Sequence, residues 1–301
     1  MSVVCSEGAK YLINRKGLRM IGKYLNSKEI TSLADTTRLS YINALRHLEE
    51  FATGKVDPTF QGMQGHMADL ADFLEKKGLS GQSVQQYLAA IKIFLRWTGN
   101  PVDYTYRISN EERKANQVKH MERWFDENDI ARCLAYEFPM YPPIEALRYR
   151  ILIRILTETA ARIGETAAVT VDNIDLEDMA IWINASKTIP RPVFFSPKTR
   201  SMLEQLKKKS KWTGTLFPDT GNLKRVITDM LIELGMKNGK DGRGPHTFRH
   251  YCITKLFYSG VRIEDIAMLA GDKVDTIRQR YIHPTALQLR EEIRKGMGWE
   301  F

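Results

Sequence analysis

The chain has 301 residues, 43% of them hydrophobic and 27% charged, which is an ordinary balance for a globular protein of about two domains. Its apolar runs, such as "ILIRIL", fall far short of the ~20 residues that a membrane helix needs. Its three widely spaced cysteines argue against a disulfide framework or a structural zinc site. Lys and Arg number 45 against 36 Asp and Glu, so the net charge of +9 favours a polyanionic partner, nucleic acid first.

The first hundred residues predict a small helical domain. Residues 1–35 hold one amphipathic stretch, which predicts a short helix in an N-terminal extension. From residue 36 the pattern is clearer, because "TTRLSYINALRHLEEFATG" spaces its apolar residues as a helix does and ends in glycine. Residues 66–78 and 83–99 repeat this pattern. We therefore expect an all-helical domain over residues 36–100.

Residues 101–120 are polar and strongly charged, and they show no sustained apolar period. This composition predicts an interdomain linker. Its charged run, "EERKANQVK", suits either a solvated face or a segment that follows a DNA backbone.

Residues 121–301 predict a second, mainly helical domain. Asp126 is a plausible N-cap for one helix, and "PPIEALRYRILIRILTETAARIG" predicts a long apolar one. Two strands are expected, Ala180–Asn184 and Pro192–Ser196, joined by a basic turn. Helices follow to the C-terminus. The fold class expected is mostly α with a small β-hairpin (α+β).

In the first half of this domain, two segments carry candidate functional residues. Arg162 follows an apolar helix and needs a strong partner if it is desolvated, which either a phosphate or Glu165 one turn later could supply. The turn "ASKTIPR" carries Lys187 and Arg191, which either reach into a site or are merely exposed.

Two further parts lie near the C-terminus. His246 and Arg249, at positions i and i+3, share a helix face close to a helix N-terminus, which attracts anions. His250 lies off that face, and a structural role is expected for it. Tyr281, in "RQRYIHP", either anchors a helix to the core or takes part in chemistry.

The chain carries an arginine, a hairpin lysine, His-x-x-Arg and a near-terminal tyrosine in this order. In this order of residues it resembles the tyrosine recombinase family of phage integrases and Xer-type enzymes. "TAARIGETAAVTVDNIDLEDMAIWI" is similar to the family's first arginine box, and "HTFRHYCITKLFYSGVRIEDIAMLAGDKVDTIRQRYIHP" to the segment from the second box to the nucleophile. The resemblance begins near residue 36. It implies a SAM-like core-binding domain at 36–100 that binds DNA, and a catalytic domain with a C-terminal tail at 121–301.

The resemblance also implies a role for each candidate. Arg162 and Arg249 would grip the non-bridging oxygens of a scissile phosphate, which gain charge during transfer. Tyr281 would attack that phosphate, giving a 3′-phosphotyrosyl link and a free 5′-hydroxyl. His246 would handle the phenol proton, and Lys187 would protonate the departing 5′-oxygen.

Supporting roles follow in the same way. Glu165 is expected to orient the first arginine or His246, and Arg191, Lys198 and Lys273 are expected to contact DNA. Because the covalent link conserves the bond energy, neither a cofactor nor a metal is expected.

One position departs from the family. Nine residues before the tyrosine, where the family usually has His or Trp, stands Asp272. A carboxylate there repels a desolvated phosphate. We therefore expect Asp272 either to turn away and pair with a cation or to leave the phosphate contact to Lys273.

The function expected is that of a site-specific recombinase acting in integration, excision or dimer resolution. Its partners would be double-stranded DNA and copies of itself, as a homotetramer on paired sites that is a monomer or weak dimer when free. The amphipathic segment at 285–301 would either join neighbouring protomers or fold back on its own domain. The expected location is the cytoplasm, on the nucleoid or, for a viral enzyme, in the host.

Three alternatives stay open. The chain could be a sequence-specific DNA-binding protein in which Asp272 marks lost catalysis. It could be a nicking-closing enzyme like type IB topoisomerases. A helical protein unrelated to nucleic acid fits the two boxes poorly.

Overall fold

The structure is a computed structural model that describes residues 15–53, 55–57, 59–121, 124–184, 190–239 and 241–282, together with Arg294 and Met297. The chain divides into two compact units, residues 1–117 and 118–301. The division falls within helix α6 (Asn110–Met121). None of the helices in the described ranges is both long and apolar enough to span a bilayer.

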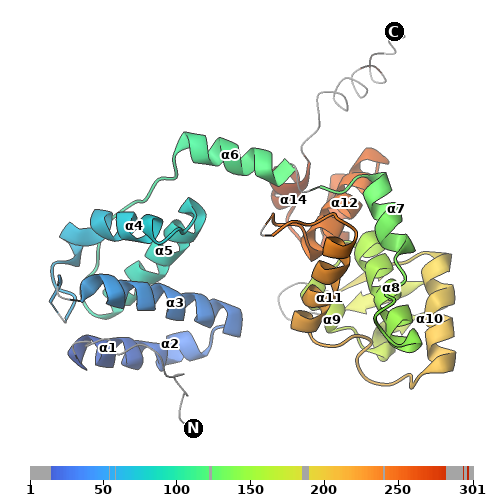
Figure 1. Ribbon diagram of the computed structural model, residues 1–301, viewed down its shortest axis with the longest axis horizontal. Coiled ribbons are helices and arrows are strands. Elements are labelled where there is room, and N and C mark those ends of the chain that lie inside the picture. Colours follow the sequence, from blue (N-terminus) through green and yellow to red (C-terminus); the bar gives the residue numbers. More distant parts are fainter. Residues whose placement is uncertain are drawn as a thin grey trace. The chain divides into compact units, whose positions relative to one another are not determined.

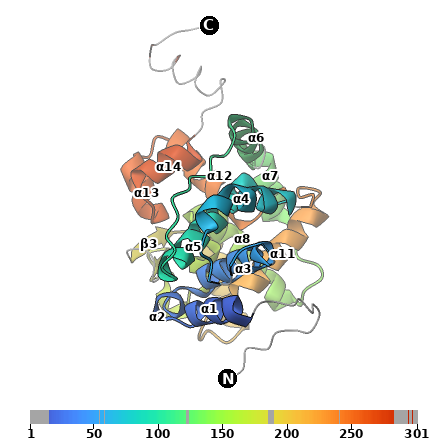
Figure 2. The ribbon, with the colours of Figure 1, turned by 90° about the vertical axis from the view of Figure 1, so that its left-hand side faces the viewer.

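The described part of the first unit is built from helices, and Figure 2 labels α1 to α5. They are α1 (Arg15–Leu25), α2 (Lys28–Thr31), α3 (Asp35–Ala52), the short 3-10 helix η1 (Met63–His66), α4 (Met67–Lys76) and α5 (Gly81–Trp97).

The core of this unit lies between α3 and α5, as the apolar spacing predicts. Leu45 and Leu48 on α3 are fully buried, and so are Ile91 and Leu95 on α5. Ser80 caps α5, because its hydroxyl accepts a hydrogen bond from the amide of Ser83 at 3.3 Å.

Two segments differ from expectation. The N-terminal stretch is more than an extension, since Ile21 and Tyr24 of α1 and Ile30 of α2 are buried in the first core. The second half of the expected linker forms most of a helix, α6, which spans Asn110–Met121. Its polar sequence has no apolar stripe, so periodicity alone does not reveal it.

The second unit contains the remaining elements (Figure 1). Its helices are α7 (Glu127–Ala135), α8 (Pro143–Thr159), α9 (Ile163–Ala167), η2 (Val171–Asn173), α10 (Pro197–Lys209), α11 (Thr220–Glu233), α12 (Pro245–Tyr258), α13 (Ile263–Ala270) and α14 (Val274–Tyr281). Its strands are β1 (Ile174–Asp175), β2 (Ala180–Ile183) and β3 (Arg191–Phe194). The fold is mostly α-helical with a small sheet, which confirms the predicted class.

The three strands form an antiparallel sheet in the order β1-β2-β3. Ile181 pairs with Val193, and both side chains are fully buried. Trp182 and Phe194 are 50% and 55% exposed. The sheet therefore packs part of its apolar surface on the core and leaves two large rings in contact with solvent.

Helix α12 lies between two clusters of buried side chains. Phe248 belongs to the main core, which includes much of α8, whereas Cys252 and Ile253 belong to a smaller cluster with α13 and α14. A helix that is buried on two sides does not need a single apolar stripe. This placement fixes α12 relative to both α8 and α14, and the candidate site is built from the ends of these helices.

Candidate active site

Arg162 is positioned by a break in the long apolar segment. Helix α8 ends at Thr159, and Ala160 takes a left-handed conformation with φ 54°. The chain then turns, so Arg162 becomes the N-cap residue of α9. Its amide donates to Glu165 Oε2 at 2.8 Å and its Nη1 donates to Glu165 Oε1 at 3.1 Å. Glu165 thus orients the first arginine through both backbone and side chain.

Arg249 lies on α12 and is only 1% exposed. Its Nη1 donates to the backbone carbonyls of Ala160 and Ala270, the latter at 2.9 Å. Its Nη2 donates to Asp272 Oδ2 at 2.8 Å, and its Nε donates to the hydroxyl of Tyr281 at 3.1 Å. Each nitrogen of this buried cation therefore has a hydrogen-bond acceptor, as burial requires.

Tyr281 is the last residue of α14 and is 7% exposed. The ring lies near two side chains of α12, with 5.6 Å from its centroid to Arg249 Cζ and 4.3 Å to the centroid of the His250 ring. Although the ring is packed, its hydroxyl points at a guanidinium of the same chain. His250 also stacks on Trp124 with ring centroids 6.0 Å apart, which fits the structural role expected for it.

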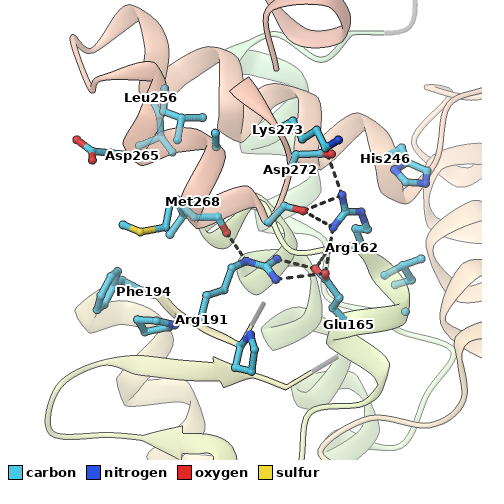
Figure 3. A pocket seen from close by; sticks show the side chains of 18 of the residues that line it. Arg162, Glu165, Arg191, Phe194, His246, Leu256, Asp265, Met268, Asp272 and Lys273 are labelled. Atoms are coloured by element: carbon cyan, nitrogen blue, oxygen red, sulfur yellow. Dashed lines mark hydrogen bonds and ion pairs between the residues drawn. The ribbon is translucent and has the colours of Figure 1, made fainter. Parts of the chain in front are cut away.

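Asp272 joins the two arginines. Its Oδ2 accepts from Arg162 Nη2 and from Arg249 Nη2, at 2.8 Å in each case. We call Arg162 and Arg249 the arginine clamp. The cations with which Asp272 pairs are thus the clamp arginines themselves, so the carboxylate does not turn away from the site. Figure 3 shows the pair with Arg162.

Arg191 lies elsewhere than expected. Instead of facing DNA it is 4% exposed and donates to Glu165 Oε2 at 2.8 Å. It also donates to the carbonyls of Leu269 at 2.7 Å and Ala270 at 3.2 Å. These bonds, drawn in part in Figure 3, use the guanidinium inside the protein, which argues against the expected DNA contact.

Gly271 makes this packing possible. Its φ is +61°, which favours glycine, and a Cβ at this position would lie 2.6 Å from Arg191 Cζ. A side chain at position 271 would therefore displace Arg191 and the turn that carries Asp272.

Glu165 is held as a carboxylate between two cations. Burial by itself would raise its pKa, but the hydrogen bonds from Arg191 and from the Arg162 amide, with the charges of both arginines, outweigh burial and lower the pKa. Its side chain is 6% exposed. It is therefore suited to positioning the arginines.

His246 stands at the start of α12 with its side chain at the surface of a pocket. Loss of solvation in the pocket lowers its pKa, as do the charges of Arg249, Arg162 and Lys224. The neutral imidazole is thereby favoured, and a neutral imidazole can accept a proton.

The pocket has a volume of about 1660 Å³ and two kinds of lining. Its polar residues include Arg162, Lys224, His246, Asp272 and Lys273. Its apolar residues include Phe194, Leu256, Val261 and Met268 (Figure 3). Four cations of the lining outnumber its three carboxylates, Glu165, Asp265 and Asp272, which favours a ligand that carries negative charge.

The other expected residues are distributed unevenly. Lys273 is exposed and lines the pocket, while Lys198 is exposed on the first turn of α10 and does not line it. Lys187 lies outside the described residues. Lys224 of α11 lines the pocket and was not among the candidates, because no motif marks it and only the packing of α11 on α9 brings it there. In the described ranges no group of three His, Cys, Asp or Glu side chains is arranged to hold a metal ion.

Comparisons with known proteins identify the family of the chain. Residues 123–288 match the phage integrase family. The tyrosine recombinase XerA of Saccharolobus solfataricus is 29% identical over 229 residues, which cover 75% of this chain and 72% of that protein.

Two solved structures share the fold. The Tn1549 transposon integrase in complex with circular intermediate DNA matches with a TM-score of 0.70 and 15% identity, covering 92% of this chain and 98% of that one. The XerH site-specific recombinase bound to its difH substrate matches with a TM-score of 0.64 and 18% identity, covering 91% and 82%.

Proposed function

The chain belongs to the phage integrase family and is a tyrosine-type site-specific DNA recombinase, and from that premise we propose that it cleaves and rejoins DNA through Tyr281. The phenol oxygen attacks a scissile phosphodiester, forming a 3′-phosphotyrosyl bond and releasing a 5′-hydroxyl. The reverse attack by a 5′-hydroxyl reseals a strand. The bond energy is kept in the covalent link throughout.

One observation carries the proposal: two guanidiniums meet at a single anionic oxygen, and one of them donates to the tyrosine hydroxyl. Asp272 Oδ2 is 2.8 Å from both clamp arginines, and Arg249 Nε is 3.1 Å from the hydroxyl oxygen of Tyr281. A phosphate oxygen held between the same guanidiniums would be close to the nucleophile, and charge that develops on it would be stabilised by groups already in place. The nucleophile and the clamp come from one chain, which favours cleavage in cis.

Proton transfer falls to two further residues. We assign His246 as the acceptor of the phenol proton, because its pKa is lowered and the neutral imidazole is therefore available near neutral pH. We assign Lys187 as the donor to the departing 5′-oxygen, on the family resemblance of the hairpin that carries it. Glu165 and Arg191 position the clamp without touching the substrate.

The DNA partner is double-stranded, and both units bind it in this proposal. We assign the core-binding role to the helical first unit, and the net charge of +9 supports contacts to many phosphates. Lys273 and Lys224 support a phosphate contact beside the clamp, because both line the pocket. The place of action that we propose is the cytoplasm.

We further propose that four copies assemble on two paired sites. Support comes from exposed apolar side chains on and beside the sheet: Trp182, Phe194 and Met268, which are 50%, 55% and 69% exposed. Helix α13 packs against β3, so Met268 lies on the element next to Phe194. A patch of this kind suits contact with another protein chain.

The test is to trap the covalent intermediate and read its DNA. Wild-type protein is incubated with sheared DNA of its source, denatured, and any DNA attached to it is sequenced at the junction. We expect adducts at one recurring sequence, and none with Tyr281→Phe. DNA binding without adducts would leave a DNA-binding protein, and relaxation of a plasmid that lacks the recurring sequence would indicate a nicking-closing enzyme.

The role of the clamp is tested by measuring covalent adduct on a nicked DNA duplex that carries the sequence recovered from the adducts. Arg162→Ala and Arg249→Ala should abolish the adduct and leave most of the binding, because affinity is spread over many phosphate contacts. Cleavage at the wild-type rate by either variant would remove that arginine from the proposed mechanism.

A further inference from the structure

We propose that Asp272 is an internal anion that occupies the arginine clamp when no DNA is bound, and that the scissile phosphate must displace it before cleavage. The part of this proposal that concerns cleavage rests on the proposed function. The occupancy of the clamp by the chain's own carboxylate does not.

The geometry is that of a ligand bound in an anion site. One oxygen, Oδ2, accepts a charge-assisted hydrogen bond from each clamp arginine at the same distance, 2.8 Å. These are the strong hydrogen bonds of a carboxylate, and their length is that expected for N⁺–H···O⁻ pairs. A phosphate oxygen would make the same two bonds, so the carboxylate and the phosphate compete for one position.

Most other acceptors around Arg249 cannot be exchanged. Its Nη1 is bonded to the backbone carbonyls of Ala160 and Ala270, and its Nε to the phenol of Tyr281. Backbone carbonyls at the ends of packed helices stay in place. Among its described partners, Asp272 is therefore the one anionic side chain that can yield its place to a substrate.

Exposure places Asp272 between the pocket and the buried cation. Its side chain is 20% exposed and lines the pocket, whereas Arg249 is 1% exposed and does not line it. A phosphate that approaches Arg249 through the pocket therefore meets Asp272 first.

The carboxylate can leave without unfolding its turn. The backbone amide of Asp272 donates to the carbonyl of Ala267 at 3.0 Å, and Gly271 fixes the turn with its positive φ. Rotation about the side-chain bonds of Asp272 withdraws Oδ2 while these contacts remain. If the carboxylate stayed, it would face the scissile phosphate with like charge.

This exchange makes the clamp selective. An isolated phosphate gains little by replacing a carboxylate that is already well bound. For a phosphodiester in a recombination site, the binding free energy of all the other protein–DNA contacts offsets the cost of displacing the carboxylate. The carboxylate is then displaced only by DNA that the protein contacts at many positions.

The first experiment needs no DNA. Thermal unfolding of the wild type and of Asp272→Asn is followed with increasing inorganic phosphate, at an ionic strength held constant with chloride. The neutral amide leaves the clamp without an anion, so phosphate should raise the melting temperature of Asp272→Asn and not that of the wild type. Asp272→Glu keeps the charge, and Asp275→Asn removes a charge from an exposed position on the first turn of α14; both should behave as the wild type. If Asp272→Asn does not fold, Asp272→Ser replaces it, because serine is also neutral.

The second experiment measures covalent adduct on the nicked duplex with the mapped sequence. Removal of the competing charge should raise the initial rate of Asp272→Asn by about tenfold, the effect of ~1.4 kcal/mol in the barrier. Asp275→Asn should keep the wild-type rate. A rate for Asp272→Asn at or below that of the wild type would mean that the carboxylate does not compete with the scissile phosphate, and it would overturn the proposal.

The two readouts separate this proposal from the one on which it partly rests. An equal response of the wild type and Asp272→Asn to phosphate overturns the internal anion, whatever the rates are. A phosphate response confined to Asp272→Asn, with no adduct from any protein, overturns cleavage by Tyr281 and leaves the occupied clamp intact.

Discussion

At the scale of single residues, the proposed mechanism makes the rate depend on the protonation of His246. Burial and three neighbouring cations lower its pKa below the ordinary value of about 6.5. The neutral imidazole, to which we assign the phenol proton, is therefore present throughout the neutral range.

The prediction is a rate of adduct formation that is nearly constant above pH ~6.5 and falls only at lower pH, as the imidazole gains its proton. His246→Gln cannot accept a proton and should lose this acid limb together with most of the rate. The measurement is the pH profile of single-turnover cleavage on the nicked duplex. An acid limb that persists unchanged in His246→Gln would assign it to another group.

The same residue affects stability in a defined direction. Because the folded chain disfavours the protonated imidazole, the unfolded chain binds more protons at this position between the two pKa values. Folding is therefore weakened as the pH falls through the unfolded value. Glu165, whose pKa is lowered, also loses its stabilising contribution as the pH falls, but in the lower range where carboxylates titrate.

At the scale of elements, the buried pair of Arg191 and Glu165 fastens β3 to α9, and the bonds from Arg191 to Leu269 and Ala270 extend the link to the end of α13. Removal of one partner leaves the other charged and buried, which typically costs about 3–5 kcal/mol. Removal of both leaves no such charge.

We predict that the effects of the two substitutions on the free energy of unfolding are not additive. Arg191→Met and Glu165→Gln should each destabilise strongly, and the double variant should be less destabilised than their sum by about 1–3 kcal/mol. Chemical denaturation measures this directly.

The matched control is the exposed pair of Arg200 and Glu204 on α10, with both side chains 43% exposed. The same substitutions there should change the free energy of unfolding by less than about 1 kcal/mol. Additive effects at 191 and 165 would show that the link between the elements is not cooperative.

Much of the fold follows from local patterns, and the failures have physical causes. Helices with a strong apolar period, such as α3, α5 and α8, are evident in the sequence, as is the hairpin. Helix α6 is not, because its polar residues carry no period. The buried position of Arg191 is hidden because its partners, Glu165 and the carbonyls of α13, are far away in sequence.

The site shows the same division. Tyr281 and Arg249 can be selected from their order and spacing, and the structure brings them together. The position of Asp272 cannot be derived from spacing, because it depends on the turn that Gly271 makes between α13 and α14.

At the scale of the whole molecule, the net charge of +9 predicts binding to DNA that weakens steeply with salt. The logarithm of the binding constant should fall linearly with the logarithm of the salt concentration, by about 0.9 for each phosphate contacted.

The prediction is that Lys273→Ala lowers this slope by about one, since an exposed lysine on the pocket is expected to contact one phosphate. Lys255→Ala is the control, because Lys255 is paired with Glu127 at 3.0 Å and does not line the pocket. Its slope should equal that of the wild type. Titrations at several salt concentrations decide, and an unchanged slope for Lys273→Ala would exclude it from the DNA contacts.

The carbonyls around Arg249 have one more consequence. Ala160 follows the last turn of α8 and Ala270 closes α13, so the partial negative charges of two helix dipoles, each about half an elementary charge, converge on one guanidinium. These dipoles exist only when both helices are formed and packed against α12. A nascent or partly unfolded chain therefore lacks the electrostatic field that holds the cation, and the power to cut DNA arises only on completion of folding.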